Sequence, residues 1–125
     1  MGKKILYIED EPFFAKLITK QLTNAGFAVT VKADGESGLK VATEEQFELI
    51  FLDLILPKLG GFDVLKKLKE NENTKHTPVV ILSNLSSDED RKKADGLGAH
   101  MFCVKMSTYP QYIVELAEKI LGSGA

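Results

Sequence analysis

The sequence predicts a single α/β domain, a doubly wound (βα)5 fold in which five parallel strands form one sheet with helices on both faces. Short runs of apolar residues alternate with segments of helical periodicity, which is typical of βα units. The runs are almost entirely apolar, as expected for strands that are covered on both faces. A length of 125 residues suits one domain. We therefore expect a domain at 1–125, with an ordered core of about 3–121.

The first two βα units are predicted in the first third of the chain. A strand near 4–8 is followed by Pro12, which suits a first helical turn, and by apolar residues at helical spacing as far as Gly26. The second strand, 28–31, is less hydrophobic and ends without a chemically active side chain, as an edge strand far from a site would. A short helix is predicted from Asp34 to about Thr43.

The remaining units follow the same alternation. Strands are predicted at 47–52, 79–82 and 101–104. Ser86 with Glu89, and Thr108 with Gln111, have the spacing of capping boxes, so these hydroxyl residues are the predicted N-caps of the last two helices.

Four of the five apolar runs stop at side chains that can take part in phosphate chemistry, namely Glu9-Asp10, Asp53, Ser83 and Lys105. The carboxyl ends of parallel strands meet at one edge of a sheet, where open α/β folds bind ligands. Short right-handed connections, together with the chemically silent second strand, predict the strand order 2-1-3-4-5. In that order the crevice lies between strands one and three, which places the acidic pair beside Asp53.

Three carboxylates at one edge repel one another, and a single pair about 4 Å apart costs roughly 4 kcal/mol at an effective dielectric near 20. Such a cluster either holds a proton or attracts a cation, and oxygen ligands suit Mg²⁺. The Lys105 ammonium and the Ser83 hydroxyl could bind phosphate oxygens. The Asp53 carboxylate could then act as a nucleophile and form an acyl phosphate.

The composition excludes several classes of function. A formal net charge of −2 argues against nucleic acid as a partner, because a phosphate backbone attracts a basic face. No long apolar stretch follows the N-terminal lysines, so neither a signal peptide nor a membrane span is expected. The single cysteine, Cys103, excludes an internal disulfide and suits a reducing compartment. We therefore expect a cytoplasmic protein.

Over essentially its full length, the chain resembles the response-regulator receiver domain of two-component signalling, which has a flavodoxin-like fold. The matching pieces occur in order along the chain: Glu9-Asp10 with Glu11-Pro12, Leu52-Asp53-Leu54 with Pro57 and Gly60-Gly61, Leu82-Ser83, and Gly98-Ala99 leading to Phe102 and Lys105.

The resemblance implies a phosphoacceptor rather than an enzyme, one that assists its own phosphorylation and dephosphorylation. Asp53 would accept a phosphoryl group from a histidine kinase or a phosphotransfer protein. Asp10 and Asp53 would bind Mg²⁺ as the cofactor, with the backbone carbonyl of Ile55. Glu9, where the family accepts either acid, would act through a water molecule. The chain itself would be a monomer or a weak homodimer.

The resemblance also implies how the phosphoryl group is sensed. Ser83 and Lys105 would bind its oxygens, and Phe102 matches the switch aromatic, which moves inward when Ser83 shifts toward the phosphate. The fourth helix, fifth strand and fifth helix would then present a changed surface to a downstream output protein or domain.

The sequence departs from the family pattern around this set. Met106 replaces the usual proline after Lys105, so we predict a trans bond there, because a cis bond without proline costs about 2.5–4 kcal/mol. Asn84 replaces a small residue, and either covers the site or points to solvent. The two positions that tune dephosphorylation in the family are the apolar Ile55 and Leu85, which predicts a long-lived phosphoaspartate.

One alternative from a different class stays open. A pseudo-receiver would keep the fold as an interaction module without being phosphorylated, and Asn84 and Met106 favour that alternative. The intact acids, Ser83 and Lys105 argue for phosphorylation instead. A flavin-type cofactor site and a haloacid-dehalogenase-type phosphatase are both excluded by the acidic sequence after the first strand, which provides neither a phosphate loop nor Asp-x-Asp.

Overall fold

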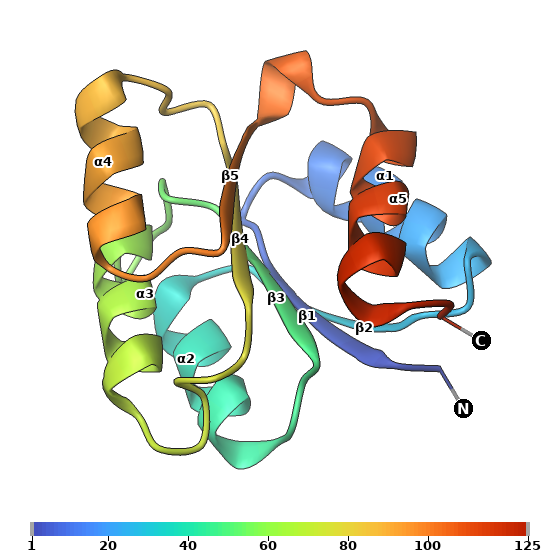
Figure 1. The fold of residues 1–125 in the computed structure, drawn as a ribbon, viewed down its shortest axis with the longest axis horizontal. Coiled ribbons are helices and arrows are strands. Elements are labelled where there is room, and N and C mark those ends of the chain that lie inside the picture. The colour runs from blue at the N-terminus through green and yellow to red at the C-terminus, as the bar shows by residue number, and fades with distance from the viewer. Residues whose placement is uncertain (1, 125) are drawn as a thin grey trace.

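The computed structural model describes residues 2–124, in which five strands alternate with five α-helices (Figure 1). The first and last residues of the predicted domain, Met1 and Ala125, lie outside the described part. The elements are β1 (Lys4–Ile8), α1 (Pro12–Asn24), β2 (Ala28–Lys32), α2 (Gly35–Glu44), β3 (Leu49–Leu52), α3 (Gly61–Glu70), β4 (Val79–Ser83), α4 (Asp88–Gly96), β5 (Met101–Val104), the 3-10 helix η1 (Lys105–Ser107) and α5 (Pro110–Leu121).

All neighbouring strands are parallel and their order is β2-β1-β3-β4-β5, which confirms the predicted fold and topology. The register places Ile8, the last residue of β1, opposite Leu52, the last residue of β3. Because both strands end at the same level, the residues that follow them emerge side by side at one edge of the sheet.

The sheet separates two hydrophobic cores, as Figure 1 shows by the helices on its two sides. Residues at alternating positions of β1 divide between them, since successive strand side chains point to opposite faces. Ile5 and Tyr7 pack in the core under α1 and α5, whereas Leu6 and Ile8 pack in the core under α2, α3 and α4. Burial on both faces explains why the strands read as continuous apolar runs.

Helix α4 begins one residue later than predicted. Its N-cap is Ser87 rather than Ser86, because the Ser87 hydroxyl oxygen accepts the Asp90 N–H at 3.1 Å. The same hydroxyl donates to the Asp90 carboxylate at 2.8 Å. The cap therefore pairs with Asp90 and not with the expected glutamate. Ala94 is the one buried residue of this mostly polar helix.

The third strand and the cap of the last helix also differ from the prediction. β3 begins at Leu49, where its pairing with β1 starts opposite Ile5, and Phe47 is buried just before the strand. Thr108 does not cap α5, because its hydroxyl donates instead to the Val104 carbonyl at 2.6 Å. Among residues 2–124, no helix combines the length and the apolar character that a membrane span requires.

Candidate functional site

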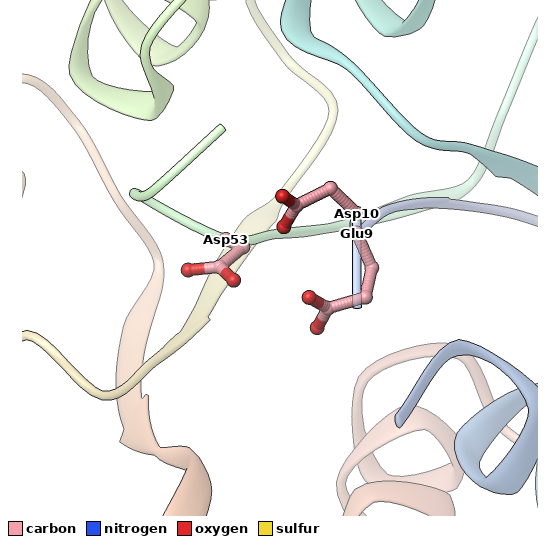
Figure 2. Close-up of side chains that lie close together, drawn as sticks. All are labelled: Glu9, Asp10 and Asp53. Carbon is pink, nitrogen blue, oxygen red and sulfur yellow. The ribbon is translucent and has the colours of Figure 1, made fainter. Parts of the chain in front are cut away.

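Three acidic side chains meet where β1 and β3 end. Glu9 and Asp10 directly follow β1, and Asp53 directly follows β3, as Figure 2 shows. One carboxylate oxygen from each lies within 4.8 Å of the others. The backbone fixes this arrangement, because the Asp53 N–H donates to the Ile8 carbonyl at 3.1 Å and so continues the ladder between the strands. The predicted acidic cluster is therefore formed by neighbouring strand ends.

Lys105, which follows β5, extends its ammonium group between two of these acids. Its Nζ donates to Asp53 Oδ2 at 2.7 Å and to Glu9 Oε2 at 2.8 Å. All three residues are buried, with at most 5% of each exposed. A third carboxylate, that of Glu11, lies 3.7 Å from Nζ, and the Phe14 ring centroid lies 5.1 Å away. The ammonium therefore bridges two acids that lie far apart in the sequence.

Glu9 is held through both of its carboxylate oxygens. Oε2 accepts from Lys105 and, at 3.3 Å, from the Glu11 N–H, while Oε1 accepts the Tyr7 hydroxyl at 2.9 Å. The pKa of Tyr7 is raised by burial and by the charge of Glu9, so the hydroxyl keeps its proton and donates it. Sequence reasoning missed Tyr7. The signal was its position two residues before Glu9, on the same face of the strand.

Burial and opposing charges shift two pKa values at this site. Burial, followed by the charge of Asp53, raises the pKa of Glu9 from 4.5 to about 7, although its hydrogen bond with Lys105 acts in the opposite direction. Burial alone would lower the pKa of Lys105. Its hydrogen bonds and charge interactions with Asp53 and Glu9 outweigh that effect and raise the pKa. At neutral pH, Glu9 is therefore partly protonated in the metal-free fold.

We expect the metal-free protein to become less stable as the pH rises from 5 to 8. Between pH 4.5 and about 7 the folded chain keeps a proton on Glu9 that the unfolded chain has released. This contribution is full below pH 4.5 and disappears as the pH rises through about 7, with an upper limit of about 3 kcal/mol. The raised pKa of Lys105 does not interfere, because that stabilisation is lost only above about 10.5.

The measurement is urea unfolding in EDTA at several pH values, with Glu9→Gln as the control that lacks the titrating proton. Wild-type protein should lose stability relative to Glu9→Gln across this range. Two parallel stability curves would contradict the expected shift of Glu9.

A cavity of about 120 Å³ opens beside the cluster, and its lining residues are Asp10, Glu11, Asp53, Ile55, Asn84 and Lys105. The side chain of Ile55 is 56% exposed, and its N–H donates to Asp53 Oδ1 at 3.2 Å. Ile55 therefore lines the same cavity as Asp53 and is largely exposed to solvent.

The two departures from the family pattern contact each other. Asn84 Oδ1 accepts the Met106 N–H at 3.0 Å, which joins the loops after β4 and β5 above the cavity. Proline, the residue usual at position 106, has no N–H to offer this bond. There is no cis peptide bond in the described residues, so the predicted trans bond between Lys105 and Met106 is confirmed. Asn84 lines the cavity rather than facing away from it.

Two of the predicted sensing residues, Ser83 and Phe102, lie outside the cavity lining, whereas Lys105 is part of it. Ser83 is fully buried, and its hydroxyl oxygen accepts the Leu85 N–H at a long 3.4 Å. Unlike Ile55, Leu85 packs against the core under α2, α3 and α4. Phe102 is half-buried against the same core, with the Arg91 guanidinium 5.0 Å from its ring centroid. Among the described residues, neither Ser83 nor Phe102 is hydrogen-bonded to the cluster of acids.

Comparison with known proteins agrees with this geometry. A family model described as the response regulator receiver domain matches residues 5–117. The transcriptional activator protein IrlR of Burkholderia pseudomallei is 38% identical over 117 residues, which are 94% of this chain and 48% of that protein. The uncharacterized transcriptional regulatory protein YkoG of Bacillus subtilis is 34% identical over 116 residues, which are 93% of this chain and 48% of that protein. The chain spans about half the length of the curated relatives it matches.

Solved structures are similar over almost the whole chain. The chemotaxis protein CheY4 of Vibrio cholerae has a TM-score of 0.88 and 26% identity, covering 97% of this chain and 100% of that one. The receiver domain of the sensor histidine kinase PA1611 from Pseudomonas aeruginosa, which has a magnesium ion coordinated in its active site cleft, also has a TM-score of 0.88. It is 25% identical, with 98% and 100% of the two chains covered. The chain therefore belongs to the response regulator receiver domain family of two-component systems.

Proposed function

We propose that this receiver domain accepts a phosphoryl group on Asp53 from a phosphohistidine. The observation that carries the proposal is the position of the Asp53 carboxylate. It lines an open cavity, its Oδ2 is bound to the Lys105 ammonium at 2.7 Å, and two further acids lie beside it. An isolated strand-end aspartate would have neither the cation nor the acidic neighbours.

The residues around Asp53 fit Mg²⁺. The cluster offers only oxygen donors, which that ion prefers. The Asp10 carboxylate is exposed and makes no hydrogen bond or ion pair with the described residues, so its oxygens are free for an ion and its waters. Asp10, Asp53 and the Ile55 carbonyl would hold Mg²⁺ directly, and Glu9 would act through a water. When bound, Mg²⁺ would neutralise negative charge on the phosphoryl oxygens.

In the proposed step, a carboxylate oxygen of Asp53 attacks the phosphorus atom of phosphohistidine. The phosphorus–nitrogen bond breaks, its electron pair stays on the imidazole nitrogen, and an acyl phosphate forms on Asp53. Lys105 is placed to transfer its hydrogen bond from Asp53 to a phosphoryl oxygen. Ser83, whose hydroxyl oxygen accepts the Leu85 N–H, would donate its own hydrogen to another phosphoryl oxygen, and its shift toward the phosphate would free space for Phe102.

The proposed partners follow from the site and its surroundings. Exposed apolar side chains, those of Phe13, Ile55 and Met106, flank the strand ends that carry the acids and Lys105, and suit contact with a protein phosphodonor. The donor would be a histidine kinase or a phosphotransfer protein. Phosphorylation would be read at α4, β5 and α5 by an output protein or domain, as the regulatory names of the curated relatives suggest.

The first expected result is one added phosphoryl group on wild-type protein and none on Asp53→Ala. The protein is incubated with MgCl₂ and acetyl phosphate, and its intact mass is measured. Asp63→Ala, which removes an acid from the first turn of α3, is the control and should be modified like wild type. If wild-type protein gains no phosphoryl group from acetyl phosphate or from any phosphohistidine donor, the domain is a pseudo-receiver.

The second expected result is a long-lived phosphoaspartate. Ile55 lines the cavity and cannot orient a water molecule, so a polar residue there should speed hydrolysis. We expect Ile55→Gln to shorten the half-life of the phosphorylated protein severalfold. Leu85→Gln should have a smaller effect on this half-life, because Leu85 packs against the core. Loss of phosphate that is fast in wild type and unchanged in both variants would refute the tuning hypothesis.

A further inference from the structure

Tyr7 is a buried titratable residue that the proposed phosphorylation does not use. The side chain is fully buried in the core under α1 and α5, where its ring packs edge-on to that of Phe51 at 6.4 Å. A buried tyrosine hydroxyl needs a hydrogen-bond partner. In the described residues that partner is Glu9, whose Oε1 accepts at 2.9 Å. Among the described residues, the one polar contact of the Tyr7 hydroxyl is therefore with the candidate metal site.

Strand geometry explains why these two residues meet. Tyr7 and Glu9 are two positions apart along extended backbone, so both side chains emerge on the same face. The Glu9 side chain is long enough to place its Oε1 atom 2.9 Å from the tyrosine hydroxyl. Aspartate is shorter by one methylene, about 1.5 Å, and would leave the hydroxyl out of hydrogen-bond reach. The pairing is therefore specific to glutamate at position 9.

The contact with Tyr7 determines which oxygen of Glu9 faces Lys105. With Oε1 held from the core side, Oε2 is the oxygen available to Lys105 at 2.8 Å and to the Glu11 N–H at 3.3 Å. The same ammonium binds Asp53 at 2.7 Å. A continuous chain of hydrogen bonds thus runs from the core hydroxyl through Glu9 and Lys105 to the phosphoacceptor, and every member is buried.

We propose that Tyr7 is a positioning residue that fixes the Glu9 carboxylate, and through it Lys105, for metal binding and phosphoryl transfer. The inference rests on the proposed function, because it assigns Tyr7 to the same Mg²⁺-dependent site. Glutamate at position 9 works in this chain since a tyrosine two residues earlier holds it. A shorter acid would not need that tyrosine.

A double-mutant cycle tests the proposal with wild type, Tyr7→Phe, Glu9→Asp and the double variant. The Mg²⁺ dissociation constant is measured from backbone amide shifts during titration with MgCl₂, and the phosphorylation rate from acetyl phosphate. Removing a hydrogen-bond partner behind a metal-binding group commonly weakens metal binding by about 10- to 100-fold. We expect Tyr7→Phe to weaken Mg²⁺ binding about tenfold when Glu9 is present, and by less than about twofold in the Glu9→Asp background.

Phe51→Leu is the matched control, because it disturbs the same aromatic pair and leaves the hydroxyl on Glu9. It should lower thermal stability without weakening Mg²⁺ binding, whereas Tyr7→Phe should weaken Mg²⁺ binding. Equal effects of Tyr7→Phe in the two backgrounds, no effect in either, or no Mg²⁺ binding by wild type would overturn the inference. If wild type binds Mg²⁺ but accepts no phosphoryl group, only the proposed function is refuted. The double-mutant cycle in the Mg²⁺ dissociation constant would still test whether Tyr7 positions Glu9.

Discussion

Replacing Lys105 with methionine is expected to destabilise the metal-free protein by about 3 kcal/mol at pH 8. The ammonium lies 2.7 Å from Asp53 and 2.8 Å from Glu9, and both carboxylates are almost fully buried. Methionine fills similar space without a charge, so the two acids would face each other in a medium that solvates them poorly. Removing one partner of a buried ion pair leaves an uncompensated charge of this kind, which is why its cost is far larger than for an exposed pair.

The cost of this substitution should depend on pH and on Mg²⁺. At pH 5 the Glu9 carboxyl is protonated, since its pKa of about 7 in the wild-type fold can only rise when the ammonium is lost. We therefore expect a smaller stability loss at pH 5 than at pH 8. Addition of MgCl₂ should return part of the stability at pH 8, because a ligand that binds only the folded state stabilises it.

Phosphorylation of Lys105→Met by acetyl phosphate should be slowed by about 10²-fold, the effect of losing one preorganised donor to developing negative charge. The control is Lys75→Met, which breaks the exposed pair between Lys75 and Glu72 at 2.9 Å and should cost under about 1 kcal/mol. Urea unfolding and intact-mass kinetics measure the two quantities. A Lys105 variant that is as stable as Lys75→Met and phosphorylated at the wild-type rate would contradict the proposed bridge.

The second large effect is expected for Gly61→Ala, at the start of α3. A Cβ atom at this position would lie 2.3 Å from the Asp53 carbonyl oxygen and 2.4 Å from Leu54 Cα. Both are backbone atoms, so no side chain can rotate away, and the loop after β3 must move. We expect a loss of about 3 kcal/mol or more, the upper part of the range for overpacking, and slower phosphorylation because Asp53 moves with that loop.

The neighbouring glycine provides the matched control for this effect. A Cβ at Gly60 would meet nothing within 4 Å, and its φ of −64° suits any residue. Gly60→Ala should therefore stay within about 0.5 kcal/mol of wild type. Thermal unfolding separates the variants readily, since about 1 kcal/mol corresponds to several degrees in a domain of this size. If the two alanine variants unfold at the same temperature, that result would contradict the close packing of Gly61 against the loop after β3.

The fold could be predicted because its main determinant is visible in the sequence. A strand covered on both faces must be apolar throughout, and runs such as 5–8 and 49–52 have no other simple interpretation. The position of Asp53 beside Glu9 follows from the strand order, which the weakly hydrophobic second strand indicated. The register between β1 and β3 required no separate prediction, because the first run ends directly before Glu9 and the second directly before Asp53.

The contacts within the site could not be predicted in the same way. Ile55 and Leu85 are each two residues beyond a strand-end residue, yet Ile55 lines the cavity and Leu85 packs against the core. The spacing from the strand end is the same in both cases, so it does not distinguish the two environments. Adjacent serines gave no means of telling which would cap α4. The bond between Asn84 and Met106 links residues 22 positions apart, and no periodicity relates them.

The position of β5 in the sheet gives the domain uneven stiffness. β3, which carries Asp53, has a hydrogen-bonded neighbour on each side, whereas β5, which carries Phe102 and leads to Lys105, pairs with β4 alone. A displacement of β5 breaks bonds along one side only, so the edge of the sheet yields before its centre does. We therefore expect phosphorylation of Asp53, at the centre of the sheet, to move β5 more than it moves β3. Because β5 is an edge strand, a protein partner could bind beside it.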